Sequence, residues 1–432
     1  MSELRPRAAG LAPDLPLAER LFAELRARTA DASGAGVTRM SYGPGEAAAH
    51  EIVYREASAL GLTLETDAAR NLYLTLPGAE EAPRLVIGSH LDSVPRGGNY
   101  DGAAGVLMGL SVVSGLVATG CVPPQPITVM AIRAEESAWF SSSYIGSRAA
   151  FGRLAAAELD TVRRAGDGQQ LGAAIEAAGG SATAVAEGLA FLTPDDIAAY
   201  IEPHIEQGPV LAHRGAALGL VTDIRGSRRY RAAICTGAYA HSGTTPRALR
   251  RDAVVAVAEL VSTLDETWQR MEADGQDLTV TFGQIATDPA EASFSKVAGH
   301  VGFSLDIRSN APSTLEQAEA ELRASVAQIE QERHVVFDLG PRTFTEPAFM
   351  DRGVIAALHR AARRAGHEIG EMPSGAGHDA ATFASLGVPT GMLFLRNLHG
   401  SHNPDEHMDM ADFQAGAEVL LQYCLDPQAP SP

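Results

Sequence analysis

Lysine is nearly absent from this chain, and cysteine is scarce. Of 34 basic residues only Lys296 is a lysine, and the three cysteines, Cys121, Cys235 and Cys424, are far apart. A Walker-type nucleotide site or a Schiff-base enzyme would depend on Lys296, yet no G-x-x-x-x-G-K segment precedes it. An odd number of widely spaced cysteines fits reduced thiols better than a disulfide framework. The near absence of lysine therefore argues against a Walker-type nucleotide site and against a Schiff-base enzyme. The few, widely spaced cysteines predict a cytoplasmic protein.

Long hydrophobic runs are also missing. The chain has no stretch of about 18 apolar residues, and its first residues lack the apolar segment of about 7 residues that is typical of a signal peptide. Its 34 basic and 53 acidic residues give a net charge of −19. A charge of this sign repels nucleic acid and anionic membrane surfaces. Neither nucleic acid nor a membrane is therefore expected as a partner.

What the chain does contain is a strand-and-helix pattern in two parts. Apolar strands at 85–90 and 126–134, with a small-residue helix at 102–117 between them, predict a mixed, mostly parallel sheet covered by helices. The pattern resumes with a helix at 354–365 and a buried strand at 390–395. We therefore predict an α/β fold whose larger catalytic domain comprises residues 1–221 and 343–432.

The segment 222–342 has a different pattern. Strands are expected at 230–235, 278–285, 301–307 and 335–339, and amphipathic helices at 253–271 and 315–329. This β-α-β-β-α-β order is that of a split βαβ unit. The sequence thus predicts a small inserted α+β domain. Its long helices and the open edge of its four-stranded sheet favour a role in dimerisation, and the alternative is a mobile lid on a monomer.

Polar side chains follow the predicted strands of the larger domain. His90 and Asp92 end the first strand, Asp101 lies in the next loop, and Glu135 and Glu136 end the second strand. The carboxyl ends of parallel strands meet at one edge of a sheet. Imidazole and carboxylate groups gathered there predict a site for a divalent ion such as Zn²⁺ or Mn²⁺. Adjacent glutamates point in opposite directions, so one can bind metal while the other acts as a base.

Other histidines need sorting. His204 and Glu206 alternate along a strand and are expected on the same side, and His402 and His407 lie in a turn after the last apolar strand. His378 completes a G-x-G-x-x-A match, but no buried strand precedes it, so a dinucleotide site is not expected there. Six further histidines have no polar cluster around them and are expected on the surface or in packing: His50, His213, His300, His334, His359 and His367.

Eight motifs occur in order along the chain. They are S-H-L-D-S-V at 89–94, G-G-x-Y-D-G at 97–102, E-E-S at 135–137, H-I-E-Q-G-P at 204–209, A-H-S-G-T-T-P at 240–246, S-L-D-I-R-S at 304–309, S-G-A-G-H-D-A at 374–380 and S-H-N-P-x-E at 401–406. On these motifs the chain resembles the hydantoinase/carbamoylase branch of the M20 metallopeptidase-like amidohydrolases. That group includes N-carbamoyl-L-amino-acid hydrolases, β-ureidopropionases and allantoate amidohydrolases.

The resemblance implies two divalent metal ions. His90, Asp101 and His204 would hold one ion, and Asp101, Glu136 and His402 the other, with Asp101 bridging. His204 marks this branch, because relatives that cleave peptides usually carry a carboxylate there. Zn²⁺ is the expected metal, with Mn²⁺, Co²⁺ or Ni²⁺ as alternatives.

The resemblance also implies roles for other residues. Glu135 would be the general base that takes a proton from water and passes it to the departing nitrogen, and Asp92 would orient His90. His241 and Arg308 would be the pair that reaches the partner's active site in a homodimer, with His241 facing the developing oxyanion and Arg308 binding a substrate carboxylate. The alternative for Arg308 is an ion pair with Asp306, which lies two residues away on the same face of the strand. Five more positions are expected to bind substrate: Gln207, Ser295, Gly375, Gly377 and His378.

Three positions depart from the family pattern. Ser295 stands where relatives often have a substrate-binding asparagine, Trp139 follows the glutamate pair where a glycine-serine-arginine run is usual, and Arg396 replaces a small residue. These departures surround the expected substrate rather than the metals. The identity of the substrate is therefore what they leave open.

The sequence thus predicts a metal-dependent amidohydrolase that cleaves a carbamoyl or amide C–N bond of a small anionic substrate, such as an N-carbamoyl-L-amino acid. Allantoate or ureidoglycolate is an alternative substrate. An aminoacylase or dipeptidase of the same superfamily is a second alternative, and a metal-binding scaffold with decayed catalysis is a third. The presence of Glu135, a residue needed only for chemistry, argues against decay.

Overall fold

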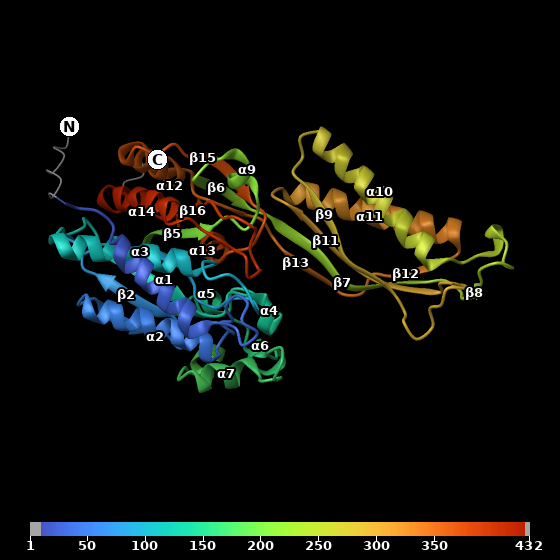
Figure 1. Cartoon of the computed structure of the whole chain (residues 1–432), viewed down its shortest axis with the longest axis horizontal. Coiled ribbons are helices and arrows are strands. Elements are labelled where there is room, and N and C mark those ends of the chain that lie inside the picture. The colour runs from blue at the N-terminus through green and yellow to red at the C-terminus, as the bar shows by residue number, and fades with distance from the viewer. Residues whose placement is uncertain (1–9, 428–432) are drawn as a thin grey trace. The chain divides into compact units, whose positions relative to one another are not determined.

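The computed structural model describes residues 10–427, which form two compact units (Figure 1). Unit 1 combines the chain up to Thr222 with the chain from Phe349 onward, and unit 2 is Asp223–Ala348. Unit 2 is therefore an insertion in unit 1. Among the described residues, no helix has the length and apolar character needed to cross a membrane.

Unit 1 is built on a nine-stranded mixed sheet with the order β1-β2-β4-β3-β5-β16-β6-β14, in which β15 also pairs with β6. The strands are β1 (Thr63–Thr66), β2 (Leu72–Leu76), β3 (Arg84–His90), β4 (Ile127–Ile132), β5 (Ile197–Ile205), β6 (Leu218–Ile224), β14 (Ala348–Phe349), β15 (Gly370–Ser374) and β16 (Thr390–Leu395). The four central strands β4, β3, β5 and β16 run parallel, whereas β2 and β6 pair antiparallel on either side. The mixed α/β fold is confirmed, and its parallel part is the centre of the sheet.

Helix α3 (Ala103–Thr119) shows how this sheet is covered. Small residues let the helix pack closely, because a Cβ at Gly105 would lie 2.1 Å from the carbonyl oxygen of Pro203. The other helices of unit 1 are α1 (Leu15–Thr29), α2 (Pro44–Ala59), α4 (Ser137–Phe140), α5 (Ile145–Ala150), α6 (Ala156–Thr161), α7 (Leu171–Ala177), α8 (Ala182–Ala186), α9 (Val210–Arg214), α12 (Arg352–Ala365), α13 (Ala380–Ser385) and α14 (Met410–Leu425), with a 3-10 turn η1 (Pro194–Asp196). The contact between α3 and β5 holds the loop before α3 next to the end of β5.

Unit 2 has a five-stranded antiparallel sheet with the order β12-β7-β11-β9, in which β13 also pairs with β7. Its elements are β7 (Gly226–Thr236), β8 (Ala240–His241), η2 (Arg247–Leu249), α10 (Ala253–Ala273), β9 (Thr279–Thr287), β10 (Lys296–Val297), β11 (His300–Ser309), α11 (Pro312–Arg333), β12 (Val336–Asp338) and β13 (Arg342–Thr345). Helices α10 and α11 lie along one face of the sheet (Figure 1) and share a hydrophobic core with it.

The long elements of unit 2 follow in the predicted order β-α-β-β-α-β. Two features differ from the prediction. The predicted boundary after residue 342 falls inside unit 2, because β13 pairs with β7 from Arg342 to Thr345. The structure also has a short ribbon in which β8 pairs with β10, so that His241 lies opposite Lys296.

Candidate metal centre

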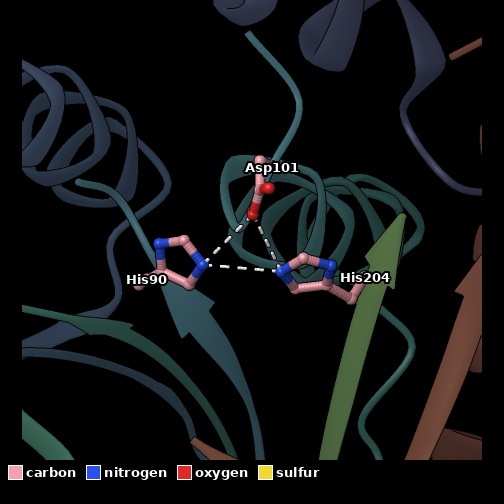
Figure 2. A group of neighbouring side chains, drawn as sticks. All are labelled: His90, Asp101 and His204. Carbon is pink, nitrogen blue, oxygen red and sulfur yellow. Dashed lines mark hydrogen bonds and ion pairs between the residues drawn. The ribbon is translucent and has the colours of Figure 1, made fainter. Parts of the chain in front are cut away.

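Three predicted ligands converge where the central strands of unit 1 end. His90 is the last residue of β3, His204 lies near the end of β5, and Asp101 stands in the loop before α3 (Figure 2). Oδ1 of Asp101 lies 3.4 Å from Nε2 of His90 and 3.2 Å from Nε2 of His204. The two imidazole nitrogens are 3.4 Å apart. These three atoms are close enough together to bind one ion.

A second group forms on the other oxygen of Asp101. Nε2 of His402 lies 3.5 Å from Oδ2 of Asp101 and 3.4 Å from Oε1 of Glu136. The structure therefore brings together all five predicted ligands, and Asp101 belongs to both groups. His402 is the exposed member, with 49% of its side chain accessible, whereas the other four are buried.

Two buried oxygens support a pair of cations here. Oδ1 of Asp101 and Oε1 of Glu136 make no hydrogen bond within the described residues. Such orphaned carboxylate oxygens are costly unless a cation compensates them. Burial lowers the pKa of His90, but hydrogen bonding with Asp101 and Asp92 outweighs it and raises that pKa well above its usual value. Hydrogen bonding with Glu136 raises the pKa of His402 to about 9. The carboxylates thus favour positive charge at this site, and the donor set fits divalent metals.

Asp92 connects the two sides of the site. Its Oδ1 lies 3.4 Å from Nδ1 of His90, and the backbone oxygen of Asp92 is 3.1 Å from the same nitrogen. In addition, the backbone N–H groups of Glu135 and Glu136 donate to the two oxygens of its carboxylate at 3.1 and 3.2 Å. Ser41 also donates to this carboxylate at 2.5 Å. Asp92 therefore holds the backbone of the glutamate pair as well as the ring of His90.

The turn before the glutamate pair has an unusual backbone. Ala134 has a φ of 53°, in the left-handed region that disfavours a residue with a side chain. The fully buried carboxylate of Glu46, from α2, accepts hydrogen bonds from the N–H of Ala134 at 2.9 Å and the guanidinium of Arg133 at 2.8 Å. These bonds compensate for the strain in the turn. Glu46 thereby fixes the direction in which Glu135 and Glu136 leave β4.

Glu135 belongs to neither group around Asp101, but it forms a third group of possible ligands with His90 and Glu136. Its Oε2 is 4.0 Å from Nε2 of His90, and its side chain is buried. Burial and the neighbouring charge of Glu136 raise the pKa of Glu135 well above its usual value. A raised pKa suits a carboxylate that accepts a proton near neutral pH and donates it again.

The loop that carries Asp101 is held from two sides. Gly102 has a φ of 65°, and a Cβ there would lie 2.5 Å from the ring of His90, so only glycine fits. On the other side, the carboxylate of Glu406 accepts hydrogen bonds from the N–H groups of Tyr100 and Asp101 at 2.9 and 3.2 Å. Burial raises the pKa of Glu406 to about 7. Glu406 is thus a support for the Asp101 loop.

The predicted substrate-binding residues of unit 1 occupy different surroundings. The amide of Gln207 donates to Oδ2 of Asp101 at 2.7 Å, next to the ligand groups. His378 is buried behind the site, with its ring 4.5 Å from that of His204, and burial lowers its pKa well below the usual value. Gly375 is exposed and Gly377 is half-buried. A Cβ at Gly377 would lie 1.7 Å from the hydroxyl of Tyr144, so the position has no room for a side chain.

Unit 2 carries the other predicted site residues. His241 is exposed on the ribbon of β8 and β10, and its Nδ1 accepts a hydrogen bond from the N–H of Gly243 at 3.1 Å. Ser295 lies beside it, because its carbonyl oxygen accepts a hydrogen bond from the N–H of Ser242 at 2.8 Å. Arg308 donates from Nε and Nη2 to Asp306 at 3.0 and 2.7 Å. His241 and Ser295 are therefore neighbours, and Arg308 is bound to a carboxylate of its own strand.

Two departures from the family pattern have structural roles. The indole N–H of Trp139 donates to the carbonyl oxygen of Ser93 at 2.7 Å, and its ring packs in a hydrophobic cluster of unit 1. Arg396 donates to both carboxylate oxygens of Asp412 at 2.8 and 3.0 Å. Both side chains are thus engaged by the protein itself. The expectation that these two residues surround the substrate receives no support from their contacts.

Glu206, which the sequence places on the side of His204, belongs to neither group around Asp101. Strand β5 ends at Ile205, and the Glu206 carboxylate accepts hydrogen bonds from the N–H groups of Val210 and Leu211, at the start of α9. Glu202 also lies near His204, and together with His378 the two form a further group of possible ligands. His407 in turn pairs with Asp409 at 3.0 Å and belongs to neither group around Asp101.

Two supports of the site were missed by the sequence reasoning. Glu406 closes the S-H-N-P-x-E motif, which is a signal that could have been used. Glu46 lies on α2 with no distinguishing motif, and only its burial and its bonds to Arg133 and Ala134 reveal its role.

Comparison with known proteins agrees with this geometry. Residues 86–426 match the model of peptidase family M20/M25/M40. The chain is 35% identical to an N-carbamoyl-L-amino-acid amidohydrolase of Paenarthrobacter aurescens over 94% of this chain and 97% of the relative. It is 34% identical to an allantoate amidohydrolase of Escherichia coli (strain K12) over 90% of this chain and 92% of the relative.

A solved structure agrees as well. The crystal structure of an amidase of the hydantoinase/carbamoylase family from Burkholderia multivorans superposes with a TM-score of 0.87 at 31% identity, covering 98% of this chain and 99% of that one. The motifs, the ligand geometry and these similarities lead to one assignment. The chain belongs to the M20/M25/M40 peptidase family and, within it, to the hydantoinase/carbamoylase branch of amidohydrolases.

Proposed function

We propose that this protein hydrolyses a carbamoyl or amide C–N bond of a small anionic substrate such as an N-carbamoyl-L-amino acid. The observation that carries the proposal is the position of Asp101. One of its carboxylate oxygens lies between His90 and His204, and the other lies near His402. The similarity to an N-carbamoyl-L-amino-acid amidohydrolase over 94% of the chain supports this substrate class.

Two divalent ions would be held by the two groups that share Asp101. His90, Asp101 and His204 would bind one, and Asp101, Glu136 and His402 the other. Imidazole and carboxylate donors suit Zn²⁺ best, and Mn²⁺, Co²⁺ and Ni²⁺ accept the same donors. When bound, such ions polarise the substrate carbonyl and make water a stronger nucleophile at neutral pH.

The protein's own groups handle the protons. Glu135 accepts a proton from the attacking water, and its raised pKa lets it donate that proton to the departing nitrogen. Asp92 keeps Glu135 in place through the backbone N–H of that residue. The water attacks the carbonyl carbon, one C–N bond breaks, and its nitrogen leaves as a neutral amine or as ammonia. From a carbamoyl substrate the remaining product is a carbamic acid, which loses carbon dioxide and thereby releases the second nitrogen.

The alternatives differ in their products. A carbamoyl amino acid yields an amino acid, carbon dioxide and ammonia, and allantoate or ureidoglycolate also releases ammonia. An aminoacylase or dipeptidase would release a carboxylic acid or an amino acid without ammonia. A metal-binding scaffold that has lost its catalysis would bind metal and hydrolyse none of these substrates. Glu135 is retained next to the ligands, which favours the enzyme readings.

A substrate screen tests the proposal. The purified protein, loaded with Zn²⁺ or Mn²⁺, is incubated with a panel of N-carbamoyl-L-amino acids, their D-isomers, allantoate and ureidoglycolate, and ammonia is measured. We expect ammonia from at least one L-carbamoyl amino acid at a higher kcat/KM than from allantoate. N-acetyl amino acids and dipeptides, followed by release of free amines, form the second arm. Turnover confined to that second arm would overturn the proposal.

We further propose that the protein works as a homodimer through unit 2, with His241 acting on the substrate of the partner. The exposed position of His241 in unit 2 supports this role. β9 lies at one end of its sheet and carries Ile285, which is 52% exposed. An open strand edge with apolar side chains favours pairing with a second copy.

Hybrid dimers test this arrangement. Variants His241→Ala and Glu135→Gln are each expected to be nearly inactive. If His241 acts across the dimer, mixing them should restore up to about a quarter of the wild-type rate, because hybrids of the two variants keep one intact site. Subunit exchange is followed with differently tagged chains. No recovery despite proven exchange would contradict action in the partner.

A further inference from the structure

Asp306 lies between two arginines on the sheet of unit 2. Arg308 is two residues further along β11, so the two side chains share a face of the strand. Arg229, on β7, lies directly opposite Asp306 in the register of the two strands. The proposed function gives Arg308 to the substrate carboxylate, yet in this structure Arg308 is bound to Asp306. Arg229 bears on how Arg308 can bind a substrate carboxylate although it is bound to Asp306 in this structure.

The two arginines use different oxygens of Asp306. Arg308 donates to Oδ2, at 3.0 Å from Nε and 2.7 Å from Nη2. Oδ1 instead faces Nε of Arg229 at 3.5 Å. This Oδ1 and this Nε are buried atoms that make no hydrogen bond within the described residues. Each therefore depends on the other for electrostatic compensation.

The charges of this group explain why two arginines are needed. Two guanidinium groups and one carboxylate leave one positive charge in excess, so a substrate carboxylate would make the group neutral. Without Arg229, Arg308 and Asp306 would already be neutral. A substrate carboxylate would then compete with Asp306 for Arg308, and the carboxylate that lost would be left unpaired beside a like charge.

We propose that Arg229 is a specificity-determining positioning residue, which holds Asp306 while Arg308 binds the anionic group of the substrate. This inference rests on the proposed function and adds to it the residue that frees Arg308 for the substrate. Arg229 does not touch the substrate in this scheme. Its contribution is confined to substrates that carry a negative charge.

Two matched substrates test the inference: the best substrate from the screen and its neutral carboxamide, which differ in charge alone. Replacing Arg229 with glutamine should raise KM for the anionic substrate about 5-fold to 20-fold, as expected for a lost charge pair that is partly buried. The values of kcat, and KM for the carboxamide, should change little. The control is Arg231→Gln, an exposed arginine two residues further along β7, which should leave both substrates unchanged.

A rescue separates this role from general support of the fold. The double variant Arg229→Gln/Asp306→Asn has one positive charge in excess again, on Arg308. It should recover most of the lost affinity for the anionic substrate, although it lacks both partners of the original pair. If the double variant stayed as weak as Arg229→Gln while both kept the thermal stability of the wild type, the inference would be overturned.

Arg308→Lys, measured in parallel, distinguishes a failure of the role proposed for Arg229 from a failure of the role proposed for Arg308. This variant keeps the charge but loses the planar pair of donors, so it should also bind the anionic substrate selectively less well. If Arg308→Lys discriminates between the substrates and Arg229→Gln does not, the inference about Arg229 fails and the proposed function stands. If Arg308→Lys affects both substrates equally, the carboxylate-binding role of Arg308 fails and the inference falls with it.

Discussion

Replacing Glu135 with glutamine should lower kcat by about 10²-fold to 10⁴-fold, the range usual for loss of general acid–base catalysis. The amide has nearly the shape of the carboxylate but cannot accept the proton of the attacking water. Because the proposed ligands are the two groups around Asp101, and neither includes Glu135, the variant should keep its full metal content, although Glu135 could also form a ligand group with His90 and Glu136. Steady-state kinetics and elemental analysis of the same preparation measure both quantities.

Glu136→Gln is the matched comparison, one residue further along the chain. Its Oε1 lies 3.4 Å from the ring nitrogen of His402, in the second ligand group. This variant should therefore lose metal as well as activity, whereas the exposed Glu51→Gln on α2 should lose neither. If the Glu135→Gln variant lost metal and the Glu136→Gln variant kept it, the roles of the two residues would be the reverse of those proposed.

Removing the metals should abolish turnover. Four ligand residues meet around a fifth, Asp101, and two of the buried oxygens of this set have no hydrogen bond among the described residues to compensate them. Prolonged dialysis against a chelator, followed by elemental analysis, prepares the metal-depleted protein. Activity should return when Zn²⁺, Mn²⁺, Co²⁺ or Ni²⁺ is added back, and the ion that gives the highest kcat/KM identifies the best fit.

Thermal unfolding gives a second measure of the same effect. Ions that bind the folded protein but not the unfolded chain raise Tm, and the stabilisation grows with the logarithm of their concentration relative to Kd. The depleted protein should therefore unfold at a lower temperature and recover with the metal. Full activity in protein shown to contain no metal would contradict the assignment of the site.

The candidate metal centre was predictable because its possible ligands follow strand ends. His90, Asp101, Glu136 and His204 each stand at the end of a central strand or in the loop just after it, and parallel strands end at one edge. The sequence alone predicts that these residues lie close together, although it gives no distance between them. His402 was predicted as a ligand from the S-H-N-P-x-E motif, because its loop shows no hydrophobic periodicity.

Other parts of the site depend on contacts that leave no pattern in the sequence. Glu46 supports the turn at Ala134 from a helix far away along the chain. Arg308 was expected to face a substrate, and its bond to Asp306 becomes informative only once Arg229 is seen on the neighbouring strand.

The position of β16 has a consequence for how the protein is made. This strand comes near the end of the chain, yet it pairs with β5 on one side and β6 on the other. Unit 2 is one continuous segment, so on the ribosome it can fold while unit 1 still lacks one of its four central strands. Until β16 emerges, the edges of β5 and β6 stay open, and His402 follows only after that strand. During synthesis the protein must therefore protect an incomplete sheet from wrong pairing, and the second ligand group is complete only near the end of translation.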